Sequence, residues 1–143
     1  MYDDILVPTD GSESATEAVR NAVELATQFD ATIHALYVID IGAMWPDAYE
    51  GNVLNDLETR GKAAVERVRE LAEEEGVAVT DDVVTGGHPH RMILDYADEN
   101  DIDCIVMGTH GRRGLDRYLL GSVTERVVRL ADVPVLTVHA PKK

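Results

Sequence analysis

Apolar residues repeat along this chain with two different periods. Short runs rich in Val, Ile and Leu are typical of buried strands, and they occupy residues 4–8, 31–38, 77–84, 101–107 and 134–139. Between these runs, apolar residues recur at every third or fourth position, which predicts amphipathic helices. The helices are expected at residues 15–29, 54–72, 88–99 and 122–131. Gly76 is placed to end the second helix, and Pro89 lies in the first turn of the third.

The alternation of strands with helices predicts an α/β fold. Strands that are joined through helices pair in parallel, and an open parallel sheet is covered by helices on both faces. At 143 residues the chain is long enough to bury a core, and we expect a single domain over residues 1–143. The irregular stretch 40–52 has two interpretations, a functional lid or a mobile connection.

The chain is strongly acidic, with 27 Asp and Glu against 13 Lys and Arg and a net charge of -14. Such a surface repels nucleic-acid backbones and anionic membranes, so neither is an expected partner. The acidic N-terminus is unlike a signal peptide and no apolar stretch is long enough to span a membrane, which favours a cytoplasmic location. Cys104 is the single cysteine, and its apolar neighbours predict a buried side chain rather than a reactive thiol.

Glycine-rich and polar residues follow the first and fourth predicted strands, at residues 7–12 and 108–122. In an open α/β sheet, ligands bind beyond the carboxyl ends of the strands, where the winding direction reverses. The second stretch combines glycines, which let the backbone approach a ligand closely, with Arg112, Arg113 and Arg117. It has two interpretations, a phosphate-binding loop or a flexible loop with solvated arginines. It matches neither the Walker A pattern nor the Gly-x-Gly-x-x-Gly pattern of dinucleotide folds.

The helix that follows this stretch offers a second feature suited to anions. Ser122 is expected to be its N-cap, with Glu125 three residues on in a capping box. The amides and the positive dipole end of the first helical turn would attract an anion. Ser122 and Thr124 would add hydroxyl donors.

The spacing of the glycines is more specific. The pattern Gly108-x2-Gly111-x9-Gly121-Ser122 resembles the glycine pattern of the ATP-binding branch of the universal stress protein family. Other short pieces resemble the same family in the same order along the chain, at residues 5–12, 37–40, 87–89, 121–125 and 133–136.

The resemblance implies a Rossmann-like fold of the adenine nucleotide alpha hydrolase type, an open five-stranded parallel sheet in the order 3-2-1-4-5. The two glycine-rich stretches would then face each other across one cleft that binds ATP with Mg2+ or Mn2+. Pro8 and Val38 would line the adenine pocket, and Asp10 would lie near the ribose or the phosphate-bound metal. The implied nucleotide-binding residues are Pro8, Thr9, Asp10, Val38, Met107, Gly108, Thr109, His110, Gly111, Gly121, Ser122, Val123 and Thr124. Arg112 joins this set on its charge alone.

Several of these polar residues also have simpler interpretations. Asp10 follows a strand and precedes a helix, so it is either a ligand contact or a helix cap. His110 is either a general base or a loop residue held by backbone contacts. His88 and His90 are close in sequence, but a metal site needs more ligands, which favours capping and surface roles.

The last predicted strand would lie at an edge of the sheet, where an apolar strand invites pairing. The resemblance implies a homodimer built through Val135, Leu136, Thr137 and Val138. The alternative is a monomer in which the C-terminal tail shields this edge.

The function implied by the resemblance is that of an ATP-binding sensor or switch in the stress response. One alternative is a slow ATP hydrolase, in which Asp10 or His110 would orient water. The other is a homodimeric interaction module that does not use the nucleotide.

Overall fold

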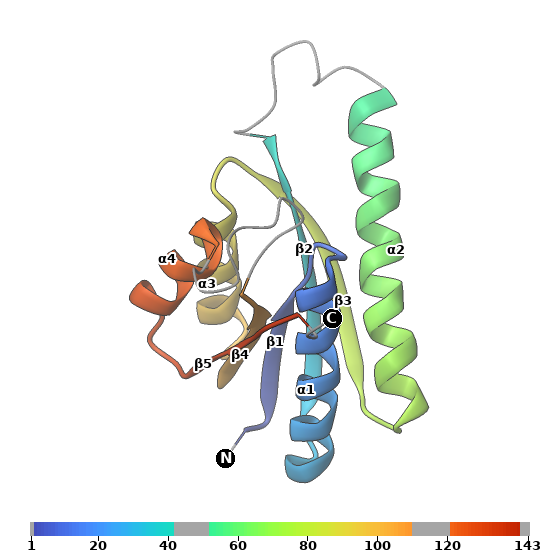
Figure 1. Cartoon of the computed structure of the whole chain (residues 1–143), viewed down its shortest axis with the longest axis vertical. Helices are drawn as coiled ribbons and strands as arrows, with labels where there is room; N and C mark the ends of the chain where they lie inside the picture. Colours follow the sequence, from blue (N-terminus) through green and yellow to red (C-terminus); the bar gives the residue numbers. More distant parts are fainter. Residues whose placement is uncertain (1, 42–51, 110–120, 141–143) are drawn as a thin grey trace.

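The computed structural model of the protein describes residues 2–41, 52–109 and 121–140 (Figure 1). Its described strands form one five-stranded parallel sheet in the order β3-β2-β1-β4-β5. The strands are β1 (Asp4–Pro8), β2 (Thr32–Asp40), β3 (Val79–Gly86), β4 (Cys104–Gly108) and β5 (Val135–Val138). The helices are α1 (Glu13–Phe29), α2 (Asn52–Glu74), α3 (Pro89–Glu99) and α4 (Ser122–Leu130). The α/β class, the parallel sheet and the implied strand order are confirmed.

Side chains of the central strand alternate between the two faces of the sheet, and each face has its own core. Ile5 and Val7 of β1 pack with α1 and α2, whereas Leu6 packs with α3 and α4. Figure 1 shows the two helix pairs on either side of the strands. These three side chains are fully buried, so the middle of β1 is apolar on both faces, as expected for a parallel sheet covered on both sides.

The winding of the sheet reverses next to β1. The chain adds β2 and then β3 on one side of β1, and β4 and then β5 on the other. In the β1–β4 pair, Ile5 aligns with Cys104 and Leu6 with Ile105, so these two strands lie side by side without being joined directly. The boundary between β1 and β4 is therefore the topological switch point of the sheet.

The start of β4 lies three residues later than the sequence pattern predicted. The Ile102 amide donates to the Ala97 carbonyl at 3.0 Å, and Asp101 has a left-handed φ of 51°. Residues 101 and 102 therefore close α3, and β4 begins at Cys104. Ile102 is buried at this helix end, which gives the segment the apolar character of a strand.

The other element ends lie within two residues of the expected ones. The β3 strand begins at Val79 rather than at Val77, because the Val77 amide donates to the Ala72 carbonyl at 2.9 Å and completes the turn after α2. Gly76 lies in that turn with a φ of +73°, a conformation that favours glycine. Of the described helices, none has the length and apolar character required to cross a bilayer.

Cys104 is a buried residue in the core of the α1–α2 face. Burial raises the pKa of its thiol, and the nearby Asp103 carboxylate raises it further. The expectation of a buried side chain is confirmed. Because the folded state disfavours the thiolate, the stability linked to this group is present below the unfolded-state pKa and is lost as the pH rises toward the raised folded-state value.

We predict that the Cys104 thiol of the folded protein reacts with an aromatic disulfide reagent at about pH 8 at least tenfold more slowly than the same thiol in urea. The reaction is followed by the absorbance of the released thiolate. The unfolded chain is its own control, since it carries the same single thiol. Equal rates in buffer and in urea would contradict the buried, protonated thiol.

Candidate functional site

The carboxyl ends of β1 and β4 meet at one edge of the sheet, because the two strands are neighbours and run in parallel (Figure 1). After Pro8 the chain turns into α1, and after Gly108 it continues toward α4. The two stretches singled out in the sequence thus begin side by side at the switch point. In α/β sheets this is where ligands bind.

The turn that joins β1 to α1 is held by its own hydrogen bonds. The Thr9 amide donates to the Leu36 carbonyl at 2.8 Å, which extends the β1–β2 ladder by one residue. The Gly11 amide donates to Thr9 Oγ1 at 3.2 Å, and Gly11 has a φ of +80°. Asp10 Oδ1 accepts from the Ser12 amide at 2.9 Å, which is an Asx turn. The turn therefore has one defined conformation and holds Asp10 at the sheet edge.

The α1 helix is capped by Ser12, not by Asp10. The Ser12 side chain accepts from the Ala15 amide at 3.3 Å, and the Ser12 backbone is extended, as an N-cap requires. The interpretation of Asp10 as the helix cap is wrong, because the chain needs two further residues to turn from β1 into the helix. Asp10 lies in that turn, half-buried, at the edge where β1 ends.

Gly108 brings the end of β4 against the first turn of α1. A Cβ atom added to Gly108 would lie 2.7 Å from the Ser14 carbonyl carbon and 2.8 Å from the Ala15 amide nitrogen, and closer still to Ser14 Oγ. Real Cβ atoms are not found so near to backbone. Only glycine fits here, and the reason lies in the packing of α1 on β4.

Two hydrogen bonds join the start of α4 to the end of β4, and a third joins Thr109 to β5. The Thr109 amide donates to the Val138 carbonyl at 2.9 Å, and the Gly121 amide donates to the Thr109 carbonyl at 2.7 Å. Thr124 Oγ1 donates to the Gly108 carbonyl at 2.8 Å, and Thr124 is buried. These bonds fix the first turn of α4 next to the carboxyl end of β4.

Gly121, rather than Ser122, is the N-cap of α4. Gly121 has extended backbone angles of -63° and 157°, and Ser122 is the first helical residue. Among the described residues no side chain caps this end, and the capping box expected between Ser122 and Glu125 does not form. The bond from Gly121 to Thr109 holds Gly121 outside the helix and moves the cap by one residue. An N-terminus without a capping side chain leaves first-turn amides for a ligand.

Some of the other expected site residues lie in the core near the switch point, and the rest lie outside the described residues. Val38, Met107 and Val123 belong to the core on the α3–α4 face, where Met107 is buried and the other two are partly exposed. Val38 lies two residues beyond Leu36, the partner of Pro8, so it also reaches the carboxyl edge of the sheet. Of the expected nucleotide-binding residues, His110, Gly111 and Arg112 lie outside the described residues.

Sequence reasoning missed Ser14, which is buried where α1 meets Gly108. It also treated Thr124 as a donor to a phosphate, whereas its hydroxyl donates to the Gly108 carbonyl. Ser14 lies 94 residues before Gly108 and Thr124 lies 16 residues after it, so no local sequence pattern indicates either contact.

Comparison with known proteins places this fold in a family. The family model described as "Universal stress protein family" matches residues 1–139. This chain belongs to the universal stress protein family. A universal stress protein of Methanocaldococcus jannaschii is 40% identical over 100% of this chain and 85% of its own length.

Solved structures agree with this assignment. The structure of a second universal stress protein of Methanocaldococcus jannaschii superposes with a TM-score of 0.88, at 35% identity, over 100% of this chain and 99% of its own. A universal stress protein solved in complex with cAMP has a TM-score of 0.76 and 27% identity, over 98% of this chain and 99% of its own.

We predict that Gly108→Ala lowers the free energy of unfolding by about 1–3 kcal/mol, since the added methyl group meets the α1 backbone. The measurement is urea unfolding followed by circular dichroism. Gly87→Ala is the matched control, because a Cβ at Gly87 meets nothing within 4 Å, and its effect should stay within about 0.5 kcal/mol. Equal effects of the two substitutions would show that the close approach of β4 to α1 is not required.

Proposed function

We propose that this universal stress protein binds ATP at the edge where β1 and β4 end, and that it acts as a nucleotide-dependent sensor or switch in the stress response. The observation that carries the proposal is the start of α4 at the topological switch point, where the N-cap is a glycine and so has no side chain of its own to occupy the first-turn amides. A helix N-terminus of this kind binds phosphate through its amides and its dipole. The cAMP complex of a relative supports an adenine nucleotide as the ligand.

Within this proposal the phosphates lie against Gly121, Ser122, Val123 and Thr124. Thr124 would contribute its backbone amide, because its hydroxyl already donates to the Gly108 carbonyl. Ser122 is exposed, so its hydroxyl is the one in this turn that a phosphate can reach from solvent. Pro8, Val38, Met107, Gly108 and Thr109 would form the walls for the base and the ribose.

Asp10 is the acidic residue that we propose for the metal ion. The described residues contain no cluster of three or more His, Cys, Asp or Glu side chains that could hold a metal ion. One carboxylate is nevertheless enough for Mg2+, which commonly takes one or two carboxylates together with phosphate oxygens and water. A bound Mg2+ or Mn2+ would screen the negative charge between the nucleotide and this acidic protein.

We also propose a homodimer through β5. Among the described strands, β5 pairs only with β4, and Leu136 on it is 44% exposed. A strand at the edge of a sheet presents backbone groups that a second copy can pair with. A two-fold axis at this edge would cover Leu136 in both subunits.

We predict that ATP with Mg2+ binds the wild-type protein and that Gly121→Asp weakens binding at least about tenfold in calorimetric titration, because a carboxylate at the cap repels phosphate. Any residue can adopt the extended backbone angles of Gly121, and Asp is a favourable N-cap; because Gly121 is buried, circular dichroism first checks that the variant keeps its fold. Gly87→Asp places the same charge at an exposed glycine and serves as the control. Wild-type affinity in Gly121→Asp, or no binding to the wild type at millimolar ATP, would overturn the proposal.

We further predict that removal of Mg2+ with a chelator weakens ATP binding and that Asp10→Asn abolishes most of this metal dependence. Asparagine keeps an oxygen that can accept from the Ser12 amide, so the turn should remain while the charge is lost. The measurement compares affinities with Mg2+ and with chelator for both proteins. An affinity for the wild type that does not change in chelator would contradict a metal-bridged phosphate.

A further inference from the structure

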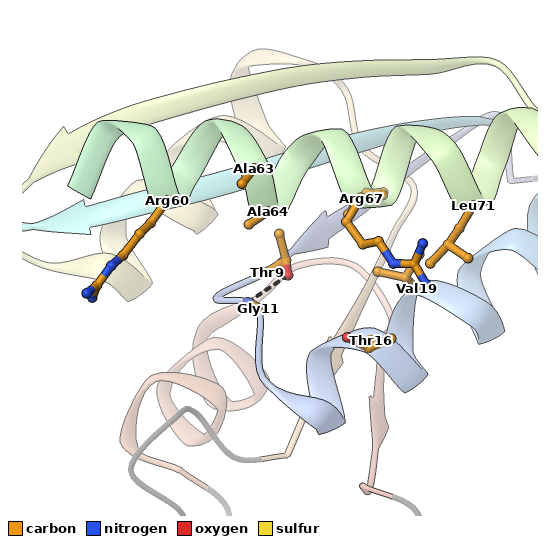
Figure 2. A pocket seen from close by; sticks show the side chains of 10 residues that line it. Thr9, Gly11, Thr16, Val19, Arg60, Ala63, Ala64, Arg67 and Leu71 are labelled. Carbon is orange, nitrogen blue, oxygen red and sulfur yellow. Dashed lines mark hydrogen bonds between the residues drawn. The ribbon is translucent and has the colours of Figure 1, made fainter. Parts of the chain in front are cut away.

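Two pockets on opposite faces of the sheet differ in how their polar groups are arranged. The pocket between α1 and α2 is lined by Arg60 and Arg67, which point away from each other in Figure 2, and the Thr16 hydroxyl donates to the Ser12 carbonyl. Its polar groups therefore do not converge. On the α3–α4 face, a pocket of about 360 Å³ lies between the end of α3 and the loop that joins α4 to β5.

This second pocket combines apolar side chains with an acidic border. Its apolar lining includes Leu94, Ile102, Leu130 and Val133. Three exposed aspartates, Asp98, Asp101 and Asp132, line it together with one arginine, Arg91. Among the described residues, none of these three carboxylates forms an ion pair. The pocket therefore suits a segment that carries cations on apolar stems.

The pocket lies next to the edge strand β5, whose backbone has one side turned outward. The Pro134 and Val138 carbonyls accept from amides of β4 and of the residue after it, at 3.0 and 2.9 Å. Backbone groups point to alternate sides along a strand, so those of Val135 and Thr137 point away from β4. A second copy related by a two-fold axis perpendicular to the sheet would pair with them as an antiparallel strand.

The segment 141–143, which lies outside the described residues, has the composition that the pocket requires. It reads Pro-Lys-Lys and contains two of the three lysines of the chain. The segment of the same copy does not reach the pocket. Asp132 lies about 20 Å back along the chain from Val138. Residues 139–143 span at most about 17 Å, and a reversal of direction uses part of that length.

The segment of a second copy does reach the pocket. In an antiparallel pair, residues that follow β5 in one copy lie beside residues that precede β5 in the other. With the two-fold axis at Thr137, Lys142 of the partner subunit lies directly opposite Asp132. With the axis at Leu136, it lies opposite Leu130. Asp132 and Leu130 both line the pocket, and opposite charges at facing positions of two strands attract.

We propose that this pocket receives the segment 141–143 of a second copy, whose two lysines lie against the three aspartates and whose proline lies against Leu130. Two-fold symmetry makes the contact reciprocal, so each dimer contains it twice. The inference rests on the β5 dimer proposed above and adds a second contact to it. Two copies with a net charge of -14 repel each other, and the segment brings cations to the surface where they meet.

The test measures the dimer dissociation constant of the full chain by sedimentation equilibrium at low ionic strength. Asp132→Lys should weaken the dimer about tenfold, because it replaces attraction by repulsion at both contacts. The same substitution lowers the net negative charge, so a change in overall repulsion alone would tighten the dimer. Lys142→Asp with Lys143→Asp should also weaken it. Combining these with Asp132→Lys should restore the constant to within about threefold of the wild type.

Glu66→Lys is the matched control, because it makes the same charge change at an exposed position of α2, which packs on β2 and β3 at the other side of the sheet. It should not weaken the dimer. Circular dichroism checks that every variant is folded. Equal effects of Asp132→Lys and Glu66→Lys, or no recovery in the combined variant, would overturn the inference.

Leu136→Lys separates this inference from the β5 dimer itself. Leu136 is exposed on β5, and a lysine there should disrupt pairing of the two strands. A dimer that Leu136→Lys disrupts and Asp132→Lys leaves intact would overturn the docked segment alone. A monomeric wild type, or a dimer that Leu136→Lys leaves intact, would overturn the β5 dimer and the docked segment with it. ATP binding is measured separately and is not affected by either outcome.

Discussion

The close approach of Gly108 to the first turn of α1 is the contact on which the geometry of the site depends. It places the end of β4 against the residues that follow β1, so the two segments at the switch point are held in contact. The Gly108 carbonyl then accepts from Thr124 and fixes the first turn of α4. One glycine thus connects β4, the start of α1 and the start of α4. A methyl group at this position would separate the parts that we propose to surround the nucleotide.

The alternation of strands and helices could be predicted from hydrophobic periodicity, because β1 and β4 are apolar on both faces and the helices are amphipathic. The strand order came from the family resemblance, since local patterns do not specify which strands are neighbours. The start of β4 could not be predicted, because Ile102 is buried at a helix end and resembles a strand residue. Burial alone does not distinguish an apolar residue at a helix end from an apolar residue in a strand.

In the candidate site too, the sequence predicted the positions of the residues but not the contacts that hold them. Gly108 was expected to let a ligand approach the backbone. In the structure, glycine is required there because α1 packs directly against it, which the local sequence does not indicate. The cap of α4 was predicted one residue too late, because the hydrogen bond from Gly121 to Thr109 joins two residues that are distant in sequence. Asp10 was located correctly at the end of β1, but its acceptance of the Ser12 amide depends on the turn geometry. Contacts between distant segments decide these details.

The measurement that tests the account most directly is an amide chemical-shift map of the wild-type protein titrated with ATP and Mg2+. The account predicts that the largest shifts cluster at Asp10, at Gly108 and Thr109, and in the first turn of α4 from Ser122 to Thr124. These residues are far apart in sequence and meet at one edge of the sheet. Shifts confined to the amino-terminal edge of the sheet, or none at millimolar ATP, would contradict the proposal that this edge is the nucleotide site.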